Sequence, residues 1–156
     1  MTHTILTRRA ALAWGAALLA VRPLLAQAGP AMHVAKDPEC GCCGAWIETL
    51  ERDGFSVTVE EMEAEALQTF KQQSGIPAAM ASCHTARTGG YMIEGHVPAA
   101  DIRRLLAERP EAVGLAVPGM PWGSPGMGPE AEREAYEVHL IGKDGTTQVF
   151  ARYTAA

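Results

Sequence analysis

Four cysteines are the residues of this chain with the most chemical potential, and three of them lie in one short segment. Residues 39–46 read ECGCCGAW, which contains Cys40, Cys42 and Cys43, and Cys83 follows further along the chain. Cys40 and Cys43 have the C-x-x-C spacing typical of a redox pair. A helix is expected to begin at this segment, and the amide groups and macrodipole at a helix N-terminus favour a thiolate. We therefore expect these sulfurs to react with oxidants or with soft metals.

Three kinds of chemistry fit these cysteines. An even number of cysteines in an exported protein ordinarily forms structural disulfides. A bond between the neighbours Cys42 and Cys43 would be strained, so this interpretation requires Cys83 as a partner. A thiol–disulfide oxidoreductase would use Cys40 and Cys43, although the third cysteine inside the motif could trap that pair in a wrong bond. A soft-metal site would use the cysteines as thiolate ligands.

Histidines can complete such a metal site. Residues 81–97 are expected to form a hairpin around a Gly-Gly turn. Counting outward from the turn places Cys83 opposite His96, with their Cβ atoms about 5 Å apart on one face. Strand alternation points His84 to the other face, as a packed or solvent-facing side chain, unless a bulge intervenes.

The kind of metal follows from the ligand types. Clustered thiolates and imidazole select Cu(I), with zinc and iron–sulfur clusters as competitors. The tight C-x-C-C grouping matches neither the two separated pairs of structural zinc sites nor the spacings of ferredoxins. Met120 and Met127 lie in the Gly/Pro-rich segment 114–129, which could fold over an open site. Their alternative role is that of flexible core fillers.

The elements expected to position these residues form an α/β, thioredoxin-like core. Apolar periodicity and turn residues predict strands, helices and a hairpin in the order strand–helix–strand–helix–hairpin–helix, over 32–36, 44–54, 55–60, 64–74, 81–97 and 98–110. The cysteine motif falls where the first strand meets the first helix. An added C-terminal hairpin is predicted over 136–153, and the segment 114–129 is expected to be an irregular loop.

The first 28 residues have the pattern of an export signal. They combine Arg8 and Arg9 with an apolar run and the small-x-small sequence Ala26-Gln27-Ala28. Arg22-Pro23 interrupts the run, which is also too short for a convincing membrane span. The general secretory route and the twin-arginine route both fit this pattern. We therefore expect an exported protein with residues 29–156 as its single domain and no membrane attachment after cleavage.

Composition excludes several partners. The chain has 156 residues, of which 47% are hydrophobic and 20% charged, as expected for one globular domain. Its formal net charge is −5, and removal of the predicted signal would delete arginines but no acidic residue. An acidic surface argues against nucleic acid as a partner. No polybasic segment indicates binding to a lipid surface.

Several longer segments together resemble one known family. CGCCGAW, SCHT, GYMIEGHVP, LLAERP and GLAVPGMPWGSPGM occur in this order. They are similar to successive segments of the CopG-type periplasmic copper-resistance proteins, a family also described as a domain of unknown function. The resemblance covers about Val34 to Tyr153. It implies a thioredoxin-like fold that binds a small cluster of copper ions, with redox chemistry at copper.

The resemblance also implies a ligand set and a role. Cu(I) would be held by Cys40, Cys42, Cys43 and Cys83, with His96 alongside and Met120, Met127 and His84 as secondary candidates. Such a protein would contribute to copper tolerance by sequestering copper, by cycling its oxidation state, or by passing it to copper-export proteins of the periplasm. The alternative from the enzyme class remains a periplasmic thiol–disulfide oxidoreductase that uses the C-x-x-C pair.

Overall fold

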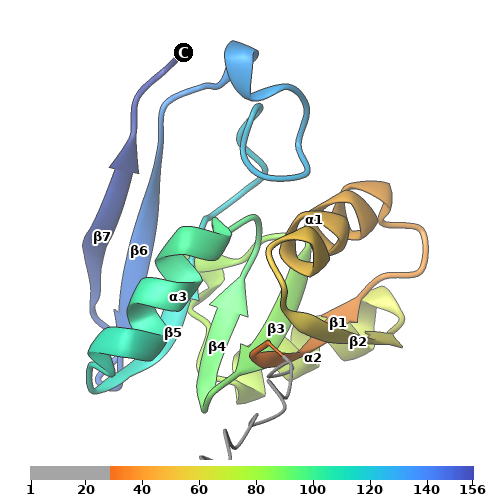
Figure 1. Cartoon of the computed structure of the whole chain (residues 1–156). Coiled ribbons are helices and arrows are strands. Elements are labelled where there is room, and N and C mark those ends of the chain that lie inside the picture. The colour runs from red at the N-terminus through yellow and green to blue at the C-terminus, as the bar shows by residue number, and fades with distance from the viewer. Residues whose placement is uncertain (1–28) are drawn as a thin grey trace, which may run out of the picture.

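The computed structural model describes residues 29–156, which form a mixed α/β structure with one seven-stranded sheet and three α-helices (Figure 1). The predicted export signal, residues 1–28, lies outside the described residues. The elements follow in the order β1 (Ala31–Lys36), α1 (Gly41–Arg52), β2 (Ser56–Glu61), α2 (Ala64–Gln73), β3 (His84–Thr88), β4 (Tyr91–Glu94), α3 (Ala99–Glu108), β5 (Ala112–Ala116), β6 (Tyr136–Gly142) and β7 (Thr147–Tyr153). Short 3₁₀ turns lie at Ala78–Met80 and Glu130–Glu132.

The predicted order of elements is present, with one strand that the sequence analysis missed. The order strand–helix–strand–helix–hairpin–helix is followed by the predicted C-terminal hairpin, β6 and β7. The segment 114–129 was expected to be irregular throughout, but residues 114–116 belong to β5. Its Gly114 lies so close to β4 that an added Cβ would meet Met92 O at 1.7 Å. The glycine that suggested a loop is therefore required by close strand packing.

The strand order of the sheet is β2-β1-β3-β4-β5-β6-β7. β1 and β2 are parallel, β3 is antiparallel to both β1 and β4, and β4 and β5 are parallel. The β3–β4 register pairs Thr88 with Tyr91, as counted from the Gly-Gly turn. Both turn glycines have positive φ angles, 55° and 91°, which a two-residue hairpin turn of this kind needs.

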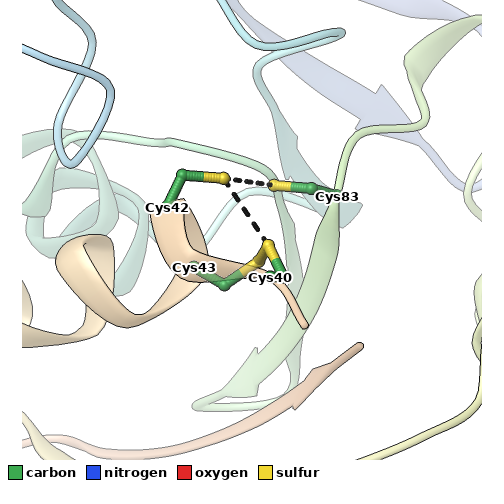
Figure 2. A group of neighbouring side chains, drawn as sticks. All are labelled: Cys40, Cys42, Cys43 and Cys83. Atoms are coloured by element: carbon green, nitrogen blue, oxygen red, sulfur yellow. Dashed lines mark hydrogen bonds between the residues drawn. A yellow bond between two sulfur atoms is a disulfide. The ribbon is translucent and has the colours of Figure 1, made fainter. Parts of the chain in front are cut away.

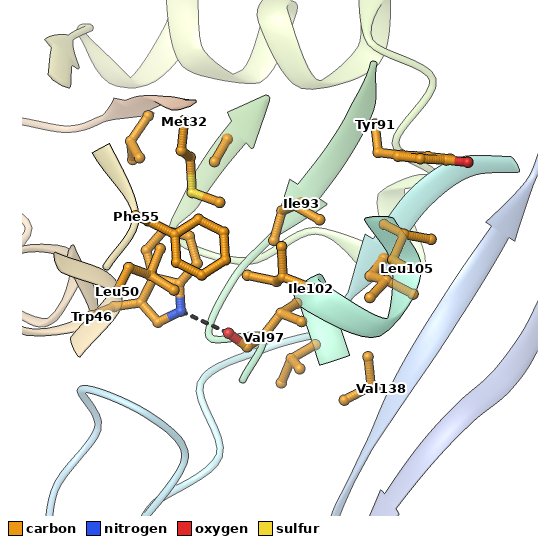
Figure 3. Close-up of a cluster of buried hydrophobic side chains, with 14 of the residues drawn as sticks. Met32, Trp46, Leu50, Phe55, Tyr91, Ile93, Val97, Ile102, Leu105 and Val138 are labelled. Carbon is orange, nitrogen blue, oxygen red and sulfur yellow. Dashed lines mark hydrogen bonds between the residues drawn. The ribbon is translucent and has the colours of Figure 1, made fainter. Parts of the chain in front are cut away.

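Helices cover both faces of the sheet. α1 and α3 lie on one face and α2 on the other (Figure 1). The larger core is formed where α1 and α3 pack on the sheet, and it contains Trp46, Leu50, Ile93, Ile102 and Leu105 (Figure 3). Under α2 lies a smaller cluster with Ile76, Met92, Ala116 and Ile141. The side chains of neighbouring strand residues such as Met92 and Ile93 thus pack on opposite faces of the sheet, as the period of a strand requires.

The edge strand β2 differs from the expected half-buried strand. Phe55 is buried and Val57 packs against the larger core, but Val59 is 47% exposed. β2 pairs only with β1, so its far end extends beyond the packed core. Within residues 29–156, no helix has the length and apolar character needed to cross a membrane.

Candidate metal centre

Three cysteines are placed by the turn from β1 into α1. Cys40 is the N-cap of α1, in an extended conformation (φ −78°, ψ 92°), and its N–H donates to Asp37 O at 3.1 Å. Cys43 lies on the inner face of the helix and is fully buried, whereas Cys42 is half-buried. The helix therefore directs two sulfurs of the motif to different surroundings.

Cys40 and Cys43 form a disulfide, and Cys42 and Cys83 are free thiols (Figure 2). The Cα atoms of the bonded pair are 5.4 Å apart. The expectation that structural disulfides would recruit Cys83 is wrong, because one helical turn already brings the C-x-x-C sulfurs into bonding distance. The bonded pair is the one that an oxidoreductase would use.

All four sulfurs nevertheless form one cluster. Their Sγ atoms lie within 4.8 Å of one another. Cys42 Sγ is 3.5 Å from Cys40 Sγ and 3.9 Å from Cys83 Sγ. Cys83 reaches the motif because it immediately precedes β3, which pairs with β1, and β1 leads into the motif. Two segments far apart in the sequence are thereby joined at one end of the sheet.

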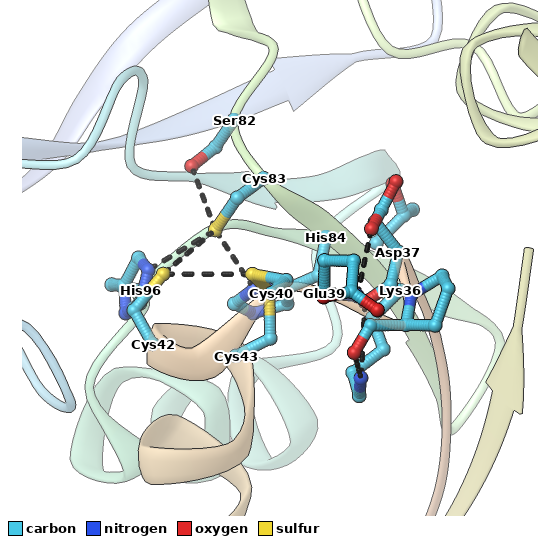
Figure 4. Close-up of a disulfide and its surroundings, with 12 residues drawn as sticks. Lys36, Asp37, Glu39, Cys40, Cys42, Cys43, Ser82, Cys83, His84 and His96 are labelled. Atoms are coloured by element: carbon cyan, nitrogen blue, oxygen red, sulfur yellow. Dashed lines mark hydrogen bonds between the residues drawn. A yellow bond between two sulfur atoms is a disulfide. The ribbon is translucent and has the colours of Figure 1, made fainter. Parts of the chain in front are cut away.

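Two histidines adjoin this cluster (Figure 4). Cys83 Sγ is 3.2 Å from His96 Nε2, as the predicted opposition across the hairpin requires. It is also 3.3 Å from His84 Nδ1, contrary to the expectation that His84 points to the opposite face. β3 begins only at His84, so Cys83 lies before the regular strand and strict alternation does not relate the two side chains. Of the two environments expected for His84, packed or solvent-facing, the structure has the packed one, since its side chain is fully buried.

A backbone carbonyl of the Gly/Pro-rich loop orients His96. Its Nδ1 lies 2.7 Å from Pro125 O. A carbonyl can only accept, so Nδ1 carries the proton and the lone pair of Nε2 faces Cys83. Histidines that bind metals are ordinarily oriented in this way by an acceptor at the other ring nitrogen. The geometry thus prepares Nε2 as a ligand.

Gly126 allows the loop to come this close. Its φ is +82°, and an added Cβ would lie 2.5 Å from the backbone N of Trp46 in α1. The loop therefore contacts the helix that carries the cysteine motif. The loop also reaches the site at Gly119, whose carbonyl accepts from Ser82 Oγ.

The loop methionines have a less defined placement. Met120 is 54% exposed and Met127 is half-buried, so neither belongs to the two core clusters. The predicted loop does pack beside the cysteines, but the contacts that place it there are made by the backbone of Gly119 and Pro125.

His84 has an unusual environment for a polar ring. It lies 4.2 Å, centroid to centroid, from Trp46 and 5.1 Å from His96. Among the described residues, its buried Nε2 has no hydrogen-bond partner. An unsatisfied buried polar group costs about 1–3 kcal/mol. Such groups are rare and call for an explanation, and a functional site is one of the usual ones.

Burial sets the protonation of the site. It raises the pKa of the Cys83 thiol to about 12, and the neighbouring Cys42 acts in the same direction. Burial also lowers the pKa of His96. Burial is likewise the main cause that holds the pKa of His84 well below its usual value, and the neighbouring His96 and Lys71 act in the same direction. At neutral pH the imidazoles are therefore neutral and able to donate lone pairs. The helix N-terminus favours thiolates only within the motif, and Cys83 lies outside α1. A cation that binds Cys83 would therefore have to displace the proton of its thiol.

The distances at Cys83 suit a metal ion. Two ligand atoms bound to one tetrahedral ion, at about 2.3 Å for sulfur and 2.0 Å for nitrogen, lie about 3.3–3.8 Å apart. The corresponding separations from Cys83 Sγ are 3.2 Å to His96 Nε2, 3.3 Å to His84 Nδ1 and 3.9 Å to Cys42 Sγ. These groups could hold a soft cation while the disulfide is intact. Reduction of the disulfide would add the sulfurs of Cys40 and Cys43.

Sequence reasoning missed two residues at this site, Pro125 and Glu94. Pro125 acts through its carbonyl, and the residue type gives no signal of that role. Glu94 carries a signal that could have been used, because a charged side chain at a strand position beside His96 is expected to have a buried partner. Glu94 is fully buried and accepts from Lys71 Nζ at 2.6 Å.

Together, the fold and the site define an α/β protein with a cysteine- and histidine-rich cluster that could hold a metal ion. Residues 80–127 match the family model described as "Protein of unknown function, DUF411". No curated protein matches at a significant level. Two solved structures, forms 1 and 2 of copper resistance protein CopG, are similar to this chain with 45% and 46% sequence identity, each with a TM-score of 0.74. Each match covers 80% of this chain and 98% of the other. The chain therefore belongs to the CopG-type copper-resistance protein family.

Proposed function

We propose that this protein is an exported, periplasmic copper-binding protein that holds Cu(I) and contributes to copper tolerance. Cys40, Cys42, Cys43 and Cys83 bind the copper as a small multinuclear thiolate cluster, with His96 alongside. Met120, Met127 and His84 are secondary candidate ligands. The copper is sequestered, cycled between oxidation states, or passed to periplasmic copper-export proteins.

One observation carries this proposal: four sulfur ligands lie within 4.8 Å of one another, and two buried imidazoles adjoin them. Cysteine thiolates and neutral imidazole are the ligands that Cu(I) prefers. Membership in a copper-resistance family supports copper over zinc or iron–sulfur clusters. Export is supported by the pattern of residues 1–28, with residues 29–156 as the single mature domain.

A thioredoxin-like core is part of the proposal. It is supported by the strand order β2-β1-β3-β4, in which β1 is central, β2 is parallel to it and β3 is antiparallel. The element order and the position of the C-x-x-C motif at the start of α1 also support it.

Full use of the four sulfurs requires reduction. Two electrons and two protons, supplied by an external dithiol, convert the Cys40–Cys43 disulfide into two thiols while the dithiol becomes a disulfide. Each thiol then releases its proton when it binds Cu(I). The copper capacity of the site therefore depends on the oxidation state of this pair.

The test is an anaerobic titration of the fully reduced protein with Cu(I), in which bound copper per chain and free thiols are measured on the same sample. We expect more than one copper per chain and protection of all four thiols from alkylation. Absence of retained copper, with the thiols freely alkylated, would refute the proposal.

A thiol–disulfide oxidoreductase is the second candidate, and the Cys40–Cys43 disulfide favours it. Cys40 is half-buried and Cys43 is fully buried, so Cys40 is the sulfur accessible to an attacking thiolate. This function predicts rapid exchange of the copper-free oxidised protein with a glutathione couple. If exchange is rapid and copper is not retained, the oxidoreductase replaces the copper-binding function.

A further inference from the structure

A buried ion pair lies directly behind the cysteine cluster. Lys71 of α2 is 3% exposed and Glu94 of β4 is fully buried, and Lys71 Nζ donates to Glu94 Oε1 at 2.6 Å. Thr85 Oγ1 donates to Glu94 Oε2 at 2.5 Å and accepts from Lys71 Nζ at 2.8 Å. These three side chains form a closed polar ring inside the protein.

The ring has a fourth partner, which belongs to the site. The backbone N–H of Ser82 donates to Glu94 Oε1 at 2.6 Å. Ser82 immediately precedes Cys83 and lies before β3, outside the paired strand residues. Glu94 thus provides the acceptor that a neighbouring strand would otherwise supply. Gly119 also holds this segment, because its N–H donates to Ala81 O and its carbonyl accepts from the Ser82 hydroxyl.

Glu94 also lies close to His96, the candidate ligand opposite Cys83. Gly95 and His96 follow it directly, and Gly95 N donates to His84 O at 3.0 Å. Gly95 has a φ of +70°, and an added Cβ would lie 2.5 Å from Ser82 Oγ. The two chain segments that present Cys83 and His96 are therefore packed against each other at Glu94.

We propose that Glu94 is a positioning residue for the metal centre: its carboxylate holds the backbone of Ser82 and thereby fixes Cys83 relative to His96 and Cys42, while Lys71 compensates its buried charge. This inference rests on the proposed copper-binding function. Groups behind metal ligands that hold them in place typically contribute 10- to 100-fold in metal affinity. In the alternative, the carboxylate of Glu94 serves only as the ion-pair partner of Lys71, and its removal would not change the position of Cys83.

Two double variants separate positioning from stability. Lys71→Met with Glu94→Gln removes the charges but keeps an oxygen that can accept from Ser82 N. Lys71→Met with Glu94→Leu removes the acceptor as well. Replacing both members of a buried ion pair by uncharged groups is often tolerated, whereas removal of one partner leaves an uncompensated charge. The two double variants therefore differ chiefly in the Ser82 acceptor.

The measurements are Cu(I) affinity by chelator competition, the rate of Cys83 alkylation in the reduced, copper-free protein, and urea unfolding. We expect the Gln variant to bind Cu(I) nearly as the wild type does. The Leu variant should bind about 10- to 100-fold more weakly, with faster alkylation of Cys83. Equal copper affinity and equal alkylation in the two variants would overturn the proposal.

A fourth measurement, hydrogen exchange, uses the wild-type chain, so it does not depend on the folding of the variants. The Ser82 amide should be protected from hydrogen exchange nearly as well as the core strands, because its acceptor is buried. Exchange at the rate of an exposed loop would refute the positioning role. If the wild type binds no Cu(I), the proposed function fails, and the alkylation and exchange measurements still decide whether Glu94 positions Cys83.

Discussion

Replacement of Gly126 by alanine is expected to weaken copper binding indirectly. It would move the loop that orients His96, although the two residues lie on different segments of the chain. The new Cβ would lie 2.5 Å from Trp46 N, whereas an ordinary contact is at least 3.4 Å, so the loop must retreat by about 0.9 Å. The same retreat at the adjacent Pro125 would lengthen its 2.7 Å bond to His96 Nδ1 to about 3.6 Å, beyond hydrogen-bonding distance. Loss of such an orienting partner costs about 10- to 100-fold in metal affinity.

Gly145 offers a matched control. It has the same φ of +82°, but no atom lies within 4 Å of an added Cβ, and it lies in the turn between β6 and β7. Alanine at either position should lower the free energy of unfolding by about 1–2 kcal/mol because of the left-handed backbone. At Gly126 the close approach to Trp46 N adds a further loss. Only Gly126→Ala should also weaken Cu(I) binding, as measured by chelator competition on the reduced proteins. Equal affinity of the two variants would refute the argument that the loop orients His96 as a ligand.

Three further predictions concern the thiols and the ion pair. Cys42→Ser should reduce bound copper per chain severely in an anaerobic titration, while exchange of the C-x-x-C disulfide with glutathione should continue. Copper affinity should fall as pH is lowered, because the raised pKa of Cys83 keeps that thiol protonated until metal binds. The expected fall is about tenfold per pH unit for each thiol proton displaced. Affinity independent of pH between 6 and 8 would argue against thiolate ligation. Lys71→Met should lower the free energy of unfolding in urea by about 3–5 kcal/mol, because it leaves Glu94 buried without its partner. Lys143→Met, which breaks an exposed ion pair, should leave the free energy of unfolding nearly unchanged.

The parts of the site that the sequence predicted are those governed by local periodicity. A two-residue turn and the period of a strand are enough to place Cys83 opposite His96, and the hairpin has that register. The C-x-x-C spacing at a helix start likewise identified Cys40 and Cys43 as a redox pair, and these two sulfurs form the disulfide, whereas the alternative pairing with Cys83 is wrong. In both cases the relevant distance is set by a few neighbouring residues, so the pattern determines it.

The parts that could not be predicted depend on contacts between distant segments. The bond from His96 to Pro125 needs the loop to pack on α1, and nothing in the local sequence encodes that contact. The approach of His84 to Cys83 depends on where β3 begins, and strand boundaries are poorly defined by periodicity. β5 was missed because its glycine is there for packing against β4.

The arrangement of the three clustered cysteines has a consequence for an oxidising compartment. The disulfide joins the outer two cysteines of the motif, so Cys42 remains free and directed toward Cys83. In an oxidising compartment, where disulfides persist, the oxidised protein would therefore keep two thiols and two neutral imidazoles within reach of one ion. Under the proposed copper-binding function, reduction by a dithiol would add two further sulfurs and raise the copper capacity of the site. The position of the third cysteine thus means that the oxidation state of the disulfide changes the number of ligands without emptying the site.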